Sequence, residues 1–177
     1  MKLFEISKLL ILNEILNTKI AVDSWHKDGE KDIGVMHIDN DAYHVILEPV
    51  SYNEIPDHPL IVVNVAFEKL VNNQSTQEMT GDNKSASKVI GAITHALHDR
   101  LQQYHCDVII FVAKDNVAKR MRVYNYVASH FGAGFSRRRE NIKLNSAGAV
   151  ATMLIGNHIA PEIVDQLEQI IIQSNKP

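Results

Sequence analysis

The sequence predicts an α/β (α+β) protein in which a mixed central sheet is flanked by helices and is followed by a C-terminal β-hairpin and helix. Residues 60–67 and 107–113 are near-continuous apolar runs, as strands buried on both faces of a sheet require. Between them, residues 85–104 have the apolar spacing of a long helix, the usual connection between parallel strands. The 177 residues, 45% of them hydrophobic, show no break in composition, so we expect one domain over residues 1–177.

The N-terminal third predicts a helix, a polar connection and a hairpin. Residues 6–17 have the periodicity of an amphipathic helix. Trp25 precedes a polar stretch, and we interpret it as the anchor of a loop. Residues 32–38 and 42–50 have the pattern of two strands joined by a tight turn at residues 39–41, whose Asp and Asn side chains favour turns.

The middle of the chain predicts a buried strand, a loop and the long helix. The polar, glycine-containing residues 70–84 predict a loop after the strand at 60–67. Ser85 or Asn83 is positioned to cap the helix that follows. The apolar face of this helix consists of Val89, Ile90, Ile93, Leu97 and Leu101.

A second helix is predicted directly after the strand at 107–113. Residues 114–116 interrupt the apolar run and offer a side-chain oxygen as the helix N-cap. Gly132 and Gly134 are typical of the end of such a helix. Its apolar face consists of Met121, Tyr124, Val127, Ala128 and Phe131, and we expect Lys119, Arg120 and Arg122 to lie mostly away from that face.

The C-terminal part predicts a second hairpin and a last helix. Residues 135–144 and 149–156 read as strands around a turn at residues 145–148. Pro161 suits the first turn of a helix over residues 159–173.

The charges are unevenly distributed along the chain. Residues 105–145 contain eight Lys and Arg against three acids, although the whole chain has a net charge of −3. This excess predicts a patch that binds an anionic partner, which is a phosphate-bearing cofactor, a protein or a nucleic acid. The candidate residues are Lys119, Arg120, Arg122, Arg137, Arg138 and Arg139. The alternative is a solvated helix face and a charged edge strand, which is the commoner explanation of such a pattern.

Other chemical signatures are weak. The single Cys106 adjoins a buried strand and is better explained by packing than as a nucleophile. His95, His98 and Asp99 lie one helical turn apart, but solvated side chains explain them better than a metal site, so we predict no metal. The apolar runs are too short to span a membrane and the N-terminus lacks the pattern of a signal peptide, so a cytoplasmic location is expected.

The order of elements over residues 32–135 resembles the GNAT acyltransferase family. In that family an asparagine, an alanine, a tyrosine and a Gly-Phe pair follow the central strand, and here these are Asn116, Ala118, Tyr124 and Gly134-Phe135. The segments TGDNKSASKVIGAI, DVIIFVAKDN and RMRVY are also similar to uncharacterised phage and prophage proteins of this fold. The resemblance implies a phage- or prophage-encoded protein in a bacterial host cell.

The resemblance further implies coenzyme A or acetyl-CoA as cofactor. The family binds the coenzyme pyrophosphate with a Q/R-x-x-G-x-G/A loop, and here Asp82, Ser85 and Ser87 occupy the Q/R and glycine positions. The candidate cofactor-binding residues are Lys84, Ser85, Ala86, Ser87 and Asn116. A helix start capped by serine explains the first four without a ligand.

The family's chemistry would be N-acyl transfer to an amine. Tyr124 is the candidate acid for the departing thiolate, with Tyr126 as a competitor, and Glu68 is the candidate base. The alternatives are a core tyrosine and a solvated strand end. The missing glycines favour a second hypothesis, a non-catalytic GNAT-like module that engages a protein or nucleic acid through the basic 114–143 region. The sequence leaves open the acceptor and whether the chain forms a homo-oligomer.

Overall fold

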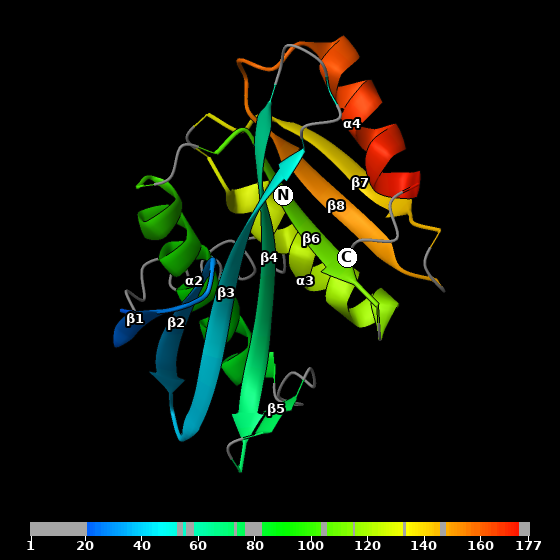
Figure 1. The fold of residues 1–177 in the computed structure, drawn as a ribbon. Coiled ribbons are helices and arrows are strands. Elements are labelled where there is room, and N and C mark those ends of the chain that lie inside the picture. Colours follow the sequence, from blue (N-terminus) through cyan, green and yellow to red (C-terminus); the bar gives the residue numbers. More distant parts are fainter. Residues whose placement is uncertain are drawn as a thin grey trace, which may run out of the picture.

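The computed structural model confirms the predicted fold class, an α+β protein with a mixed sheet, flanking helices and a C-terminal β-hairpin and helix (Figure 1). The structure describes residues 21–52, 55, 59–72, 74–76, 83–103, 106–114, 116–132, 134–145 and 148–173. The predicted helix at residues 6–17 and Asp82 lie outside these residues.

Eight strands of the described chain form one sheet. Their bounds are β1 (Ser24–Asp28), β2 (Lys31–Ile38), β3 (Asp41–Tyr52), β4 (Leu60–Val71), β5 (Gln74–Thr76), β6 (Val108–Ala113), β7 (Arg137–Lys143) and β8 (Val150–Ile155). The strand order is β1-β2-β3-β4-β6-β8-β7, and β5 pairs with β4 beside this path. Only β4 and β6 pair in parallel among the described strands, which confirms that the two most apolar runs are parallel neighbours at the centre.

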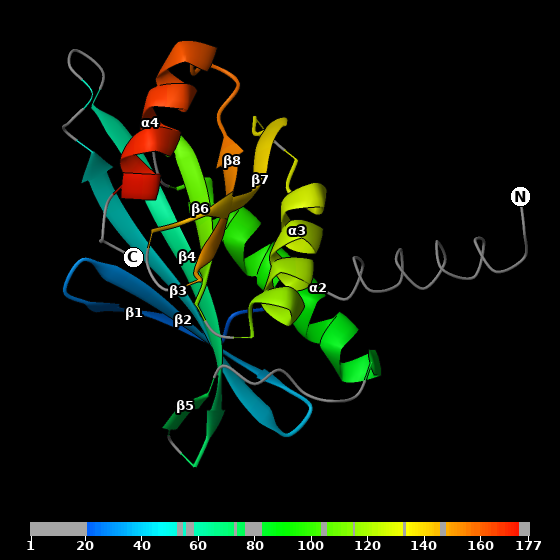
Figure 2. The same cartoon turned by 90° about the vertical axis from the view of Figure 1, so that its right-hand side faces the viewer.

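Helices cover both faces of the sheet (Figure 2). The helices α2 (Asn83–Leu101) and α3 (Val117–His130) pack on one face, and α4 (Pro161–Gln173) packs on the other. Neighbouring residues of β4 and β6 therefore belong to different core layers: Val63 and Ile109 face α2 and α3, whereas Val62 and Ile110 face α4. This two-sided burial explains why both strands are continuous apolar runs rather than alternating ones.

The predicted loop around Trp25 was wrong, because β1 forms a hairpin with β2. The Trp25 ring lies directly over Gly34, where an added Cβ would come within 2.9 Å of it. The Arg100 guanidinium lies 5.1 Å from the centroid of the same ring. Trp25 thus anchors a strand, and glycine at position 34 leaves the space that its ring needs.

The predicted loop at residues 70–84 was also wrong in its first part, because β4 continues to Val71 and turns back into β5. Asn72 takes the left-handed backbone, with φ 53°, that this short turn requires. Both predicted hairpins are confirmed: β2 pairs with β3 across a turn at residues 39–40, and β7 pairs with β8.

The start of α3 is defined by the backbone of Asn116. Asn116 is the N-cap residue, but it has a left-handed backbone with φ 49° and its side chain makes no capping hydrogen bond. Its carbonyl oxygen accepts hydrogen bonds from the N–H groups of Lys119 and Arg120, at 2.9 and 3.1 Å. Asn116 therefore supplies no side-chain cap to α3, while Asp115, the other candidate for the N-cap oxygen in the 114–116 segment, lies outside the described residues.

Candidate functional site

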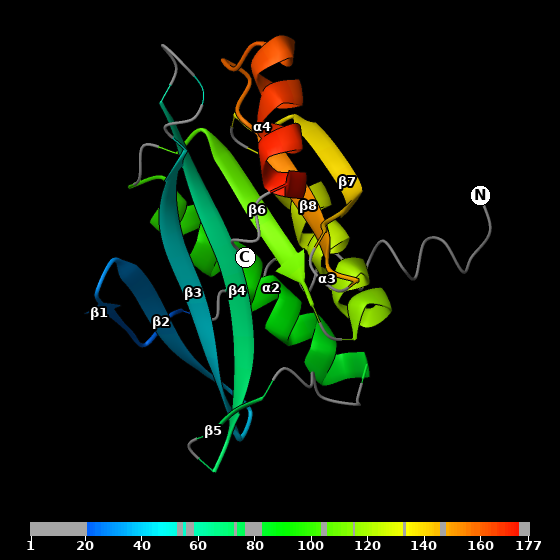
Figure 3. The same cartoon turned by 45° about the vertical axis from the view of Figure 1, so that its right-hand side comes forward.

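The carboxyl ends of β4 and β6 are the place where the sheet changes its pairing. The parallel register runs from Val62 opposite Val108 to Val65 opposite Phe111. Beyond Val65, β4 continues to Val71 against β3 and β5, whereas the end of β6 pairs with β8. The two strands therefore diverge toward their carboxyl ends (Figure 3). Ligands of sheets with parallel strands typically bind at such an edge.

The helices that follow both strands begin at this same edge. Lys88 in the second turn of α2 pairs with Asp39 in the β2–β3 turn, with Nζ and Oδ1 2.8 Å apart. Because β2 and β4 run in the same direction, that turn lies at the carboxyl edge. The helix α3 begins four residues after the end of β6. Two helix N-termini, with their partial positive charge, thus lie near the diverging strands.

Tyr124 fills the space between the diverging strands. Its ring stacks on Phe111 of β6, with centroids 5.3 Å apart, and meets Phe67 of β4 edge-on at 5.1 Å. The residue has no exposed surface. Burial raises the pKa of its hydroxyl, the Arg120 guanidinium opposes this rise, and the Glu68 carboxylate adds to it. Tyr124 is thus a core residue whose hydroxyl lies in the same electrostatic environment as Arg120 and Glu68.

Arg120 is buried, contrary to the prediction that it lies away from the apolar face. It is 7% exposed, and its guanidinium donates to the Tyr124 hydroxyl at 3.4 Å. Its Nε atom has no hydrogen-bond partner, and no carboxylate of the described residues forms an ion pair with it. A buried charge without a counter-ion is unfavourable by several kcal/mol, about 3 or more. Arg120 therefore gives the carboxyl edge a positive charge that the described protein does not neutralise.

Glu68 is half-buried on the sheet face away from α2 and α3, opposite His44 of β3. Burial and the neighbouring His26 lower the pKa of the His44 imidazole, and the Glu68 carboxylate opposes them. The rings of His26 and His44 lie 6.4 Å apart. His44 is a proton acceptor that the sequence reasoning missed, although the alternation of β3 and β4 could have placed it beside Glu68.

The candidate cofactor-binding residues fall at the two helix starts. Lys84, Ser85, Ala86 and Ser87 lie in the first turns of α2, which begins at Asn83 rather than at Ser85, and their side chains are outside the described part. Asn116 is exposed at the start of α3. The structure therefore brings these backbone segments to the carboxyl edge.

The predicted basic patch is divided. Lys119 and Arg122 are exposed on α3, but three arginines of β7 bind protein groups. Arg137 donates to the carbonyls of Gly156, at 2.8 Å, and of Ile159. Arg138 pairs with Glu140 at 3.3 Å, and Arg139 pairs with Asp165 at 2.9 Å and Glu168 at 3.6 Å. Only Arg139 of the three links the hairpin to α4, and all three present less free positive charge than the sequence suggests.

At the opposite edge of the sheet, Cys106 and Asp107 make internal contacts. Asp107 is 8% exposed, and it accepts a hydrogen bond from the Ile61 N–H at 2.8 Å while its other oxygen lies 2.8 Å from His158 Nε2. The Cys106 thiol donates to the Val108 carbonyl at 3.2 Å, and burial raises its pKa to about 12. Such a thiol is not a nucleophile at neutral pH, in agreement with the packing interpretation.

Comparison of the chain with protein families, with curated proteins and with solved structures found no match. Within the described part of the chain, no helix is long and apolar enough to cross a membrane. The same residues contain no group of three or more His, Cys, Asp or Glu side chains that could hold a metal ion.

Proposed function

We propose that this chain is a GNAT-like protein that binds coenzyme A or acetyl-CoA at the carboxyl ends of β4 and β6 and transfers the acyl group to an amine. The order of elements and the parallel pair at the centre of the sheet agree with what the sequence resemblance implies. The observation that carries the proposal is the buried Arg120 at an edge where α2 and α3 both begin.

This edge has the chemistry that a pyrophosphate requires. The first N–H groups of a helix lack intrahelical partners, and α3 has neither an acidic residue in its first turn nor a side-chain cap. A guanidinium that binds a phosphate in a partly dehydrated place forms a stronger hydrogen bond than it does in water. An anion at this edge would therefore recover part of the free energy that the burial of Arg120 costs.

The acyl transfer needs a base and an acid on the two sides of the thioester. The amine attacks the thioester carbonyl, its proton passes to Glu68 or His44, and the departing thiolate takes a proton from Tyr124. Because burial raises the pKa of Tyr124, its hydroxyl stays protonated at neutral pH. The hydroxyl is enclosed by Phe67, Phe111 and α3, so part of this packing has to open before a thiolate can reach it.

Isothermal titration with acetyl-CoA tests the binding step. We expect saturable binding to the wild-type chain and binding about tenfold weaker to Arg120→Met, because the substitution removes a charge-assisted contact. The control is Lys31→Gln, which removes an exposed charge on β2 away from this edge. Absence of heat with the wild-type chain would refute the proposal. Release of free thiol in the presence of a panel of amines then tests the transfer step.

A second candidate function is a non-catalytic GNAT-like module, and the complete burial of Tyr124 favours it. Such a module binds a protein or nucleic acid through the basic 114–143 region. The ion pairs of Arg138 and Arg139 weigh against the nucleic-acid version. A mobility shift at low salt with single- and double-stranded DNA tests that version, and Ala at positions 137, 138 and 139 together should flatten the salt dependence of any binding.

A further inference from the structure

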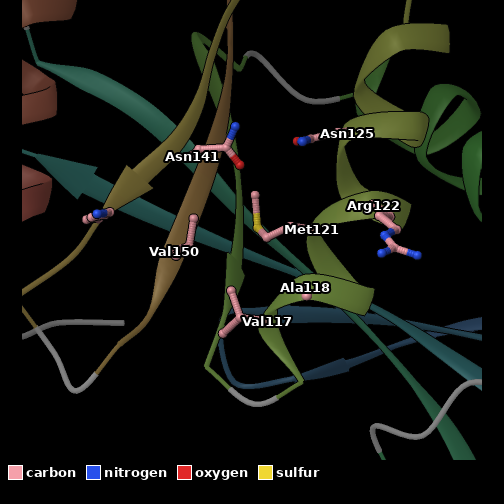
Figure 4. A pocket seen from close by; sticks show the side chains of 8 residues that line it. Val117, Ala118, Met121, Arg122, Asn125, Asn141 and Val150 are labelled. Atoms are coloured by element: carbon pink, nitrogen blue, oxygen red, sulfur yellow. The ribbon is translucent and has the colours of Figure 1, made fainter.

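A pocket of about 390 Å³ lies between α3 and the β7–β8 hairpin (Figure 4). Its volume is in the lower part of the range of small-molecule sites. Its lining residues are Val117, Ala118, Met121, Arg122, Asn125, Asn141, Lys143 and Val150.

A β-bulge turns Asn141 into this pocket. Arg139 pairs with Met153 and Ile142 pairs with Ala151, so Glu140 and Asn141 both lie opposite the single residue Thr152. Asn141 takes the left-handed backbone, with φ 60°. Strict alternation would have placed residue 141 on the face that α4 covers. Bulges often redirect a side chain beside a functional site.

Asn125 faces Asn141 from α3. The hydroxyl of Thr152, which is completely buried, donates to Asn125 Oδ1 at 2.7 Å. This bond fixes the orientation of the amide and leaves both N–H groups of Asn125 without a partner among the described residues. The side chains of Asn125 and Asn141 point toward one another across the pocket, above Met121 (Figure 4). Asn125, held by the Thr152 hydroxyl, and the exposed Asn141 can both offer side-chain N–H donors to a single group between them.

The two charged residues that line the pocket are both positive. Arg122 on the helix side and Lys143 on the strand side have no ion pair with a described residue, unlike Arg137, Arg138 and Arg139 of the same hairpin. None of the lining residues is acidic. The neighbouring Glu140 pairs with Arg138 at 3.3 Å. The positive potential of the pocket therefore favours an anion.

We propose that this pocket binds a small organic carboxylate with an aliphatic body. The carboxylate accepts hydrogen bonds from the side-chain N–H groups of Asn125 and Asn141. The positive potential of Arg122 and Lys143 stabilises its negative charge. The aliphatic body packs on Val117, Met121 and Val150. The polar residues that carry this inference take no part in the contacts of Arg120, Tyr124 or Glu68 described above, although the pocket shares the first turn of α3 with the coenzyme proposal.

The test uses N-acetyl-L-leucine, which has one carboxylate, one amide and a branched aliphatic side chain. A titration followed by two-dimensional ¹H–¹⁵N NMR should shift the backbone signals of the lining residues of α3 and β7 at concentrations up to about 10 mM, where a ligand with a Kd of about 1 mM nearly saturates its site. The uncharged N-acetyl-L-leucinamide should cause much smaller shifts. Equal shifts with both compounds, or none with the acid, would overturn the proposal.

Two variants locate the site without disturbing the fold. Asn125→Asp keeps an acceptor for the Thr152 hydroxyl but repels a carboxylate, and we expect binding at least about tenfold weaker. Asn141→Gly removes the amide and keeps the left-handed backbone, so we expect a smaller loss of several-fold. Lys31→Gln is the control, and the thermal midpoint of each variant reports on folding. Binding that survives Asn125→Asp but is lost in Arg120→Met would place the probe at the β4–β6 edge and overturn the pocket assignment.

Discussion

The two ends of the parallel strands differ in how their polar groups are satisfied. At the amino end, Asp107 has partners on both oxygens, and the buried Asp32 forms ion pairs with Arg100 through Oδ2 at 2.8 Å and with Lys27 through Oδ1 at 3.5 Å, although Oδ1 accepts no hydrogen bond. At the carboxyl end, Arg120 is equally buried but has no ion pair with a described residue, and Asn116 leaves the start of α3 without a side-chain cap. We call the amino end the closed edge, because its buried charges have ion-pair partners. We call the carboxyl end the open edge, because the buried Arg120 has no ion pair with a described residue.

The two edges therefore distinguish buried groups that stabilise the fold from buried groups that can bind a ligand. A buried group with all its partners stabilises the folded chain and gains nothing from a ligand. A buried charge without a counter-ion costs stability, and a ligand of opposite charge can return that cost as binding free energy. Local exceptions to polar satisfaction are therefore expected at functional sites.

The largest expected effect concerns the two helix arginines, Arg100 and Arg120. Arg100→Met should lower the free energy of unfolding by about 2 to 3 kcal/mol, because it leaves the Asp32 carboxylate, 1% exposed, with weaker compensation from Lys27 at 3.5 Å. Arg120→Met should leave that free energy unchanged or raise it by about 1 kcal/mol, because it replaces an uncompensated charge by an apolar chain. Urea unfolding followed by far-UV circular dichroism measures both.

The paired design makes each arginine the control of the other, since both are substituted by the same residue in a helix that packs on the same sheet face. A loss of stability in Arg120→Met as large as that in Arg100→Met would mean that Arg120 is a structural residue. The comparison between the two edges would then fail.

A smaller effect concerns Cys106 at the closed edge and depends on pH. Burial raises the pKa of this thiol from 9.0 to about 12. The unfolded chain therefore ionises first as pH rises, so the stability contributed by the buried thiol is complete below pH 9 and is lost as pH rises toward 12. We expect this group to remove about 1 kcal/mol from the free energy of unfolding between pH 8 and pH 10.

Cys106→Ala isolates this contribution. Urea unfolding at pH 8 and pH 10 should show a fall in stability that is about 1 kcal/mol smaller in the variant than in the wild-type chain. An equal fall in both proteins would mean that the thiol is hydrated. The closed edge would then be more open than its contacts indicate.

The sequence predicted the centre of the fold because burial there is strong and local. Residues 60–67 and 107–113 are buried on both faces, so their apolar runs are unambiguous. The two hairpins were predictable because turn residues lie between alternating strands. The short strand β1 was missed because four of its five residues are exposed, and its partner β2 decides its conformation.

The candidate site was less predictable because its chemistry depends on contacts between distant residues. The sequence pattern indicates that Arg120 is exposed, and only its packing beside Tyr124 in the structure shows that it is buried. In the sequence Arg137 and Arg139 are typical of a free basic run, although residues 19 to 29 positions further along the chain bind them. No local pattern marks the bulge that turns Asn141 toward Asn125, because it arises from the register between β7 and β8.

The smallest expected effect concerns Asn116 at the open edge. Its backbone is left-handed, with φ 49°, and its side chain makes no capping bond, so glycine fits this position at least as well. Asn116→Gly should therefore change the free energy of unfolding by less than about 1 kcal/mol and in the stabilising direction, whereas Asn116→Ala should lose about 1 kcal/mol to backbone strain. A loss in the glycine variant equal to that in the alanine variant would show that the side chain itself stabilises α3.

Titration of Asn116→Gly with acetyl-CoA then distinguishes two ways in which the open edge could bind the coenzyme. If the Asn116 amide contacts the coenzyme, the variant binds more weakly although it is no less stable; if only the N–H groups of α3 do, its affinity is unchanged.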